Sequence, residues 1–315
     1  MTVSPPDWRH DLVMILVIMV WGVNYVIVKA ALEVLHPHVL NAIRLVISAL
    51  AVGLVHVITQ RRPLVGLAGP FRRHRVRVIL VSLLGYFLYQ AAFILGLDRT
   101  LAGSAALIMA SSPVWTAVTS SGLGYERIPR SAWAALLVAF SGTAVVVLSG
   151  TADVSFGATA LIGNIIVLVA AMMWGSYTTL SRPLVHEMPV YGLTFISIII
   201  ALPFMVGISM PYIGAVDWSG VSPLMWGGIA LSGGLSTGLG VAVWNASVRR
   251  IGPAHTAVFS NLTPFVAVLS SWLFLGEQIF PAQIVGGMLI LIGLVLMRRI
   301  RRRSAAIPMP PTAPR

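Results

Sequence analysis

Ten long apolar stretches, separated only by short polar connections, constrain the fold of this chain more than any other feature. A helix needs about 20 apolar residues to cross a hydrocarbon core of about 30 Å. Of the 315 residues only 10% are charged, whereas soluble domains are about a quarter charged. The sequence therefore predicts an all-α integral membrane protein with ten transmembrane helices, nine being the main competing number. The predicted spans are 11–31, 38–58, 77–97, 100–121, 131–150, 160–180, 190–213, 223–247, 253–275 and 281–297.

The segments that flank the spans are short and polar. Residues 1–10 are expected to form a cytoplasmic tail, and the apolar run after them is expected to stay as a first helix, since no small-residue cleavage site closes it. Residues 298–315 are basic and then rich in proline, which predicts a second cytoplasmic tail. The chain has no cysteine, so disulfides and thiolate chemistry are excluded. No cofactor or metal is expected.

The basic residues indicate how the chain lies in the membrane. If both ends are cytoplasmic, only Lys29 and Arg99 of the 21 basic residues fall on the opposite side, and Arg44 falls within a span. This distribution follows the positive-inside rule. The net charge of +12 is thereby explained by topology, without a nucleic-acid partner. We expect a multi-pass protein of a bacterial inner membrane that functions as a monomer and contacts lipid and a small-molecule substrate.

The two halves of the chain repeat one another. Four identities are separated by 151 residues, and the Trp-Gly pairs at 21–22 and 174–175 by 153; the four are Arg99/Arg250, Pro113/Pro264, Glu126/Glu277 and Gly142/Gly293. The predicted repeats are residues 11–150 and 160–297, each with five spans. Because five is odd, the second repeat must enter the membrane upside down. Inverted repeats with a site near the bilayer midplane are an arrangement of secondary transporters.

Specific motifs in both halves resemble a known family. They are Trp21-Gly-Val-Asn-Tyr25 with Lys29 and Arg44, Ser112-Pro-Val leading to Gly124-Tyr-Glu126, and Thr263-Pro-Phe leading to Leu275-Gly-Glu277. Together they resemble EamA-type members of the drug/metabolite transporter superfamily over nearly the whole chain. The resemblance implies a ten-helix carrier of small metabolites, often an exporter of amino acids. Two departures are an extra Tyr125 in the first half and Ser197 where the second half would repeat Arg44.

Polar and aromatic side chains at mid-membrane depth on one helix face predict a substrate cavity. The first and sixth spans each carry such a set at spacing i, i+3, i+4. The alternative for the hydroxyl groups is bonding within or between helices. The predicted substrate-binding residues are Trp21, Asn24, Tyr25, Arg44, Tyr86, Tyr89, Gln90, Ser112, Trp115, Trp174, Tyr177, Thr178, Asn261 and Thr263, with helix kinks at Pro113 and Pro264.

Several charged and aromatic residues have two interpretations. Arg44 could bind a substrate carboxylate or extend to the outer headgroups, as Lys29 is expected to do. Glu126 and Glu277 are expected to stabilise the N-terminus of the helix that follows each. Trp244, near a span end, is interpreted as part of an interfacial aromatic belt.

The sequence favours a carrier over other functions. It predicts alternating-access export of neutral or aromatic amino acids or related compounds. No acidic residue lies in the middle of a span, which favours facilitated diffusion or exchange. Proton-coupled efflux of a drug or metabolite is the alternative. A channel, or a membrane enzyme, is a rival from another class, but the HExxH motif is absent from the sequence.

Overall fold

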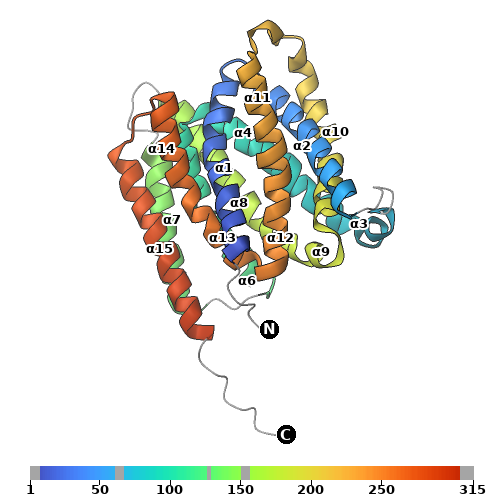
Figure 1. Cartoon of the computed structure of the whole chain (residues 1–315). Coiled ribbons are helices and arrows are strands. Elements are labelled where there is room, and N and C mark those ends of the chain that lie inside the picture. Colours follow the sequence, from blue (N-terminus) through green and yellow to red (C-terminus); the bar gives the residue numbers. More distant parts are fainter. Residues whose placement is uncertain (1–7, 61–66, 126–128, 150–156, 306–315) are drawn as a thin grey trace.

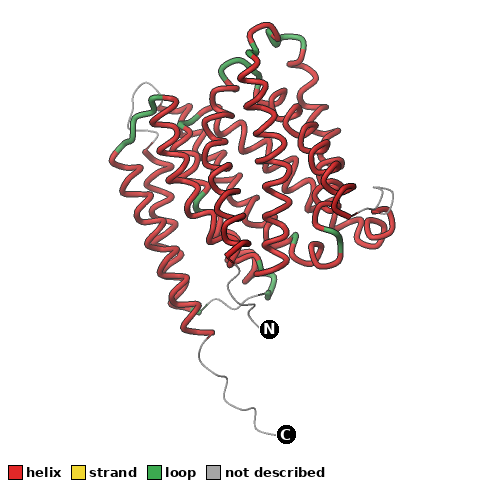
Figure 2. The backbone as a smooth tube through the Cα atoms, in the orientation of Figure 1, coloured by secondary structure: helices red, strands yellow, loops and turns green. Residues whose placement is uncertain are grey.

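The computed structural model describes residues 8–60, 67–125, 129–149 and 157–305, and these form helices with no strand among them (Figure 2). The first repeat contains α1 (Trp8–Leu32), α2 (Pro37–Gln60), α3 (Ala68–Ser82), η2 (Leu83–Leu88), α4 (Tyr89–Arg99), α5 (Ala102–Met109), α6 (Ser112–Gly122) and α7 (Arg130–Ser149). The second contains α8 (Gly157–Leu180), α9 (Arg182–Glu187), α10 (Val190–Ile213), η3 (Trp218–Gly220), α11 (Pro223–Leu231), η4 (Ser232–Gly240), α12 (Val241–Ile251), α13 (Pro253–Phe259), η5 (Ser260–Leu262), α14 (Thr263–Leu275) and α15 (Pro281–Ala305).

These elements make ten membrane crossings, as predicted. Within the described residues, eight continuous helical stretches are long and apolar enough to span a bilayer, and Pro281–Met297 adds a shorter apolar helix. The remaining crossing is divided into α5 and α6, which individually are too short. Wide outward faces are apolar: Leu50, Leu54 and Ile58 on α2 lie one turn apart and are more than 60% exposed. Such a surface is typical of a face that contacts lipid.

The two repeats pack with reciprocal pairings. Helix α1 contacts α14, and its repeat partner α8 contacts α6; likewise α2 contacts η4, and α10 contacts η2. The start of α1 and the last turns of α15 lie at the same end of the bundle, drawn at the bottom of Figure 1 and called the lower end here. The opposite end, called the upper end, carries the turn between α4 and α5.

Two repeat-related irregularities interrupt the spans. Segments η2 and η4 are π-helical, and they lie within the third and eighth crossings. The fourth and ninth crossings are broken just before Pro113 and Pro264, and each proline occupies the first turn of the helix that continues, α6 or α14. Proline is tolerated at that position because its missing N–H would be unbonded there anyway. The breaks lie at mid-bundle, beside the central cavity.

Helices α7 and α15 lie side by side at one edge of the bundle (Figure 1). Glycines permit their close approach. A Cβ built on Gly293 would lie 2.6 Å from Ala135 O, and one on Gly142 would lie 2.7 Å from Ile290 N. Small residues of this kind let helix backbones approach within a membrane. This pair therefore forms a tightly packed edge away from the cavity.

Candidate functional site

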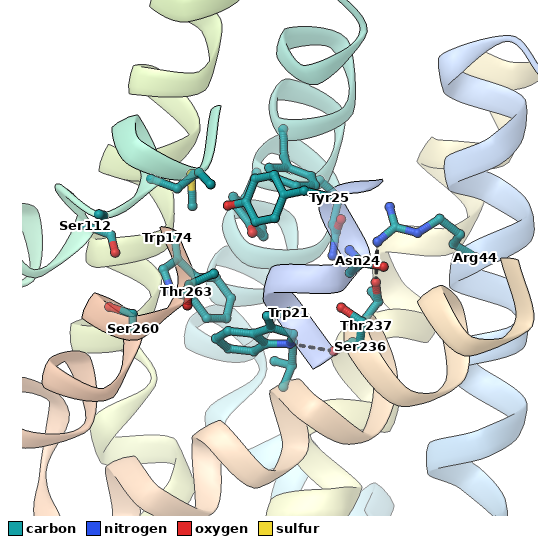
Figure 3. Close-up of a pocket in the computed structure, with 17 residues that line it drawn as sticks. Trp21, Asn24, Tyr25, Arg44, Ser112, Trp174, Ser236, Thr237, Ser260 and Thr263 are labelled. Carbon is teal, nitrogen blue, oxygen red and sulfur yellow. Dashed lines mark hydrogen bonds between the residues drawn. The ribbon is translucent and has the colours of Figure 1, made fainter. Parts of the chain in front are cut away.

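A central cavity lies at mid-bundle where both repeats meet (Figure 3). Nine of the fourteen predicted substrate-binding residues line it: Trp21, Asn24, Tyr25, Arg44, Tyr89, Gln90, Ser112, Trp174 and Thr263. The lining residues absent from that prediction are Phe93, Ala106, Met109, Ala110, Ser236, Thr237, Val241 and Ser260. The cavity is thus built from both repeats.

The cavity is narrow in this conformation. The space open to the centres of water molecules is about 60 Å³. One water needs roughly 10–15 Å³ of such space, so the cavity has room for several waters. Its walls must therefore move apart before a larger molecule can enter.

Aromatic rings form the middle of the cavity wall. The ring of Trp21 lies 5.6 Å from that of Trp174 in an edge-to-face arrangement, and Tyr89 lies 5.0 Å from Trp174. Trp21 Nε1 donates to Ser236 O at 3.1 Å, which fixes the indole against η4. Trp244 completes this cluster, 5.2 Å from Trp21. It is fully buried, so its interpretation as an interfacial belt residue is wrong.

Arg44 supplies the positive charge of the cavity. Its side chain, only 1% exposed, turns into the bundle and does not extend to the headgroups. Nε donates to Ser232 Oγ at 2.7 Å, Nη2 to Thr237 Oγ1 at 2.7 Å and Nη1 to Asn41 Oδ1 at 3.2 Å. These partners are all neutral, and no carboxylate within the described residues pairs with the guanidinium. A buried charge ordinarily has an ionic partner.

The second repeat has no matching charge. Helix α10 carries Ser197 at the position that corresponds to Arg44, and this serine is also buried. The cavity is therefore electrostatically asymmetric although its framework is repeated.

Three buried polar atoms of lining residues have no hydrogen-bond partner within the described part of the chain. They are Asn24 Oδ1, Gln90 Oε1 and Thr263 Oγ1, and each side chain is more than nine-tenths buried. A buried polar atom without a partner costs about 1–3 kcal/mol. Their presence in one cavity indicates that water or a bound molecule supplies the missing bonds.

The five predicted site residues that do not line the cavity lie in its supporting shell. Tyr86 OH lies 3.3 Å from Tyr177 OH, which donates to Asn245 Oδ1 at 3.1 Å. Thr178 Oγ1 accepts a bond from Trp244 Nε1 at 3.2 Å. These bonds join the third, sixth and eighth crossings on the lower side of the tryptophan cluster.

The other two lie at the helix breaks. Trp115 packs edge-to-face on Phe140 with 6.0 Å between ring centres, and its Nε1 has no partner among the described residues. Asn261, in η5, is half-buried. Neither side chain reaches the cavity lining.

The turn between α4 and α5 is held at the upper end by two charged residues, which we call the upper clasp. Lys29 Nζ donates to the carbonyls of Leu97, Asp98 and Thr100 at 2.8–3.0 Å. Glu277 accepts bonds from the amides of Ala102 and Gly103 at 2.7 and 3.0 Å. Cations suit helix C-termini and anions suit helix N-termini.

The upper clasp corrects two expectations. Lys29 does not extend to the headgroups, because it is used within the protein. Glu277 stabilises the N-terminus of α5, in the other repeat, and not that of the helix that follows it. Glu126 lies outside the described residues.

The profile of the EamA-like transporter family matches residues 8–148 and 161–299. A protein of Salmonella typhimurium named a "probable amino-acid metabolite efflux pump" is 27% identical, with 92% of this chain and 96% of that protein covered. A "probable terminal-alkyne amino-acid exporter" of Streptantibioticus cattleyicolor is 25% identical, with 94% and 96% covered.

A Bacillus subtilis transporter, YyaM, is 25% identical over 71% of this chain and 73% of its own length. One solved crystal structure shares the fold, with a TM-score of 0.68 and 17% identity over 96% of this chain and all of the other. Both repeats match the family profile, and ten crossings enclose a cavity between them. The chain is therefore a multi-pass membrane transporter that belongs to the EamA-like transporter family.

Proposed function

We propose that this transporter exports amino acids or closely related zwitterions across the bacterial inner membrane, with Arg44 holding the substrate carboxylate. The observation that carries the proposal is a buried guanidinium that lines the cavity and bonds only to neutral groups. Its three bonds leave further N–H donors of the guanidinium unused. A carboxylate is the group that fits such donors best, because it accepts two parallel N–H bonds.

The same region offers acceptors for the substrate ammonium group. Asn24 and Gln90 each bring an unpartnered amide oxygen to the cavity. Figure 3 shows Asn24 beside Thr237, which itself bonds to Arg44. One charged donor and two amide acceptors together match the α-carboxylate and α-ammonium of an amino acid. The aromatic wall next to them accommodates an uncharged side chain.

The cavity chemistry favours transport without proton coupling. None of the described residues that line it is Asp, Glu or His. Proton-driven carriers usually place an ionisable side chain at the site. We therefore propose facilitated diffusion or exchange, by alternating access of the two inverted repeats. The arginine distribution supports cytoplasmic N- and C-termini. The exporter names of two relatives support outward movement.

Counterflow from proteoliposomes tests the substrate class. Vesicles with purified protein are loaded with a mixture of amino acids and other metabolites, and mass spectrometry follows which compounds leave, with and without a pH gradient. We expect selective loss of neutral zwitterions, unchanged by the gradient. Loss that requires the gradient supports the proton-coupled alternative, and loss of compounds without a carboxylate contradicts the role of Arg44.

Variants of Arg44 test its role directly. We expect Arg44→Gln to reduce amino-acid transport at least tenfold, because the carboxylate loses its charged donor. Arg44→Lys keeps the charge but not the fork of donors, so it retains part of the activity. Arg249→Gln, at an exposed position in the last turn of α12, is the matched control and leaves transport unchanged. Full transport by Arg44→Gln, with normal folding, contradicts the proposal.

A further inference from the structure

The cavity has a second polar end, opposite Arg44. Figure 3 shows Arg44 and Thr237 at one side, and Ser112, Ser260 and Thr263 at the other, with the rings of Trp21 and Tyr25 between them. The cavity therefore runs from a charged end, past an aromatic middle, to an end lined by hydroxyl groups.

The second polar end is built by the internal repeat. Ser112 and Thr263 occupy corresponding positions, each directly before the proline that opens α6 or α14. The two helix breaks bring these residues into one cavity from different repeats. Both side chains are more than nine-tenths buried. A purely apolar substrate would leave these hydroxyl groups buried against carbon.

Thr263 is the decisive member. Its Oγ1 makes no hydrogen bond within the described part of the chain, although a threonine in the first turn of a helix has main-chain groups close by. Thr143, by contrast, satisfies its buried hydroxyl by donating to Ala139 O at 3.1 Å. Ser260 likewise donates to Ala257 O at 2.6 Å. Thr263 lines the cavity, so its unpartnered hydroxyl can bond to a ligand held there.

We infer that Ser112 and Thr263 form a distal subsite that selects amino acids whose side chain ends in a hydroxyl group, over analogues that lack it. This inference rests on the proposed function, since the substrate carboxylate must lie at Arg44. For an aromatic substrate such as tyrosine, the ring packs among Trp21, Tyr25 and Trp174, and the hydroxyl group bonds to Thr263 Oγ1. A site that hydrogen-bonds a substrate hydroxyl rejects the analogue without it, because its own polar groups are then left unpaired.

The test compares L-tyrosine with L-phenylalanine, which differ by a single hydroxyl. Counterflow of each compound is measured in proteoliposomes with the full chain. We expect tyrosine to be moved about tenfold faster at subsaturating concentration. Thr263→Val, which keeps the shape, should reduce the preference to below about threefold, because tyrosine loses its partner and phenylalanine no longer leaves a hydroxyl group unpaired. Thr263→Ser should restore it, and Ser112→Ala should weaken it.

Thr143→Val removes a buried hydroxyl outside the cavity and leaves the preference unchanged. Equal transport of both compounds by the unmodified protein, or a preference that survives Thr263→Val, overturns the subsite and leaves the amino-acid proposal standing. Transport of no amino acid at all overturns both.

Discussion

Lys29 stabilises the upper end of the bundle through main-chain atoms and not through an acidic side chain. Its three bonds satisfy carbonyls at the C-terminal end of α4, where no further helical turn can do so. We expect Lys29→Met to lower the free energy of unfolding by about 1–3 kcal/mol, because buried carbonyls lose their donor. The thermal midpoint of the purified protein in detergent measures this change.

Glu33 supplies the control for that variant. It follows Lys29 by one turn at the end of α1, and its side chain is exposed. Glu33→Gln should leave the midpoint within about 1 °C, since surface changes cost little. An equal thermal midpoint for the Lys29→Met variant and the unmodified protein would contradict the stabilising role of the upper clasp.

The contacts of individual side chains are the feature that the sequence predicts least well. Lys29 has an apolar stem and a charged end, so it can reach either the lipid headgroups or the C-terminal end of a helix. The position of α4 decides which of the two it contacts. The partner of Glu277 lies about 175 positions away along the chain, on α5. Trp244 lies near a span end in sequence, yet α1 and α8 bury it. In each case the deciding contact comes from another helix.

The contact between α7 and α15 leaves little space for added volume. Any Cβ at Gly293 meets the main chain of α7, which cannot rotate away. We expect Gly293→Val to destabilise the protein by about 1–3 kcal/mol or more, since overpacking forces the helices apart. Reduced yield of monodisperse protein and a lower thermal midpoint are the measurements.

A glycine with free space gives the matched comparison. A Cβ on Gly207, inside α10, would meet nothing within 4 Å. Gly207→Ala should therefore keep or slightly raise the midpoint, because alanine favours a helix by about 1 kcal/mol. Equal losses in the two variants would show that close packing is not the cause.

The two π-helical segments explain part of the difference between the predicted and the observed cavity lining. The sequence groups Tyr86 with Tyr89 and Gln90 on one helical face, but η2 ends between them, and its wider turns rotate Tyr86 towards Tyr177. The glycine-rich η4 packs closely on α2, where a Cβ on Gly233 would lie 2.7 Å from Arg44 O. Its hydroxyl residues Ser236 and Thr237 also line the cavity, which a regular 3.6-residue period does not indicate.

The absence of cysteine from the chain allows a direct test of its orientation in the membrane. Ser219 is exposed in the upper loop between α10 and α11, and Ser131 is exposed at the lower start of α7. In intact cells, a membrane-impermeant thiol reagent should label Ser219→Cys, and should label Ser131→Cys only after permeabilisation. The opposite pattern would reverse the proposed orientation.

The global architecture was accessible from sequence because it depends on length, apolarity and repetition. Hydropathy predicts the ten crossings, and the 151-residue separation of matching residues in the two halves predicts the inverted repeat. The same offset could not reveal which side chains lie in the cavity, since Ser112 and Thr263 line it while Trp115, on the same helix as Ser112, does not. That distinction depends on how each break turns the helix that follows.

Among the described residues that line the cavity, Arg44 alone carries a guanidinium, and α10 has Ser197 in the corresponding place. In the proposed alternating-access cycle, the inward-facing and outward-facing forms are therefore expected to differ in how strongly they hold an anionic group. In a carrier that is coupled to no other gradient, the ratio of maximal rate to half-saturating concentration must be equal in both directions, because otherwise it would concentrate its cargo without an energy source. The face with the lower half-saturating concentration must then also have the lower maximal rate.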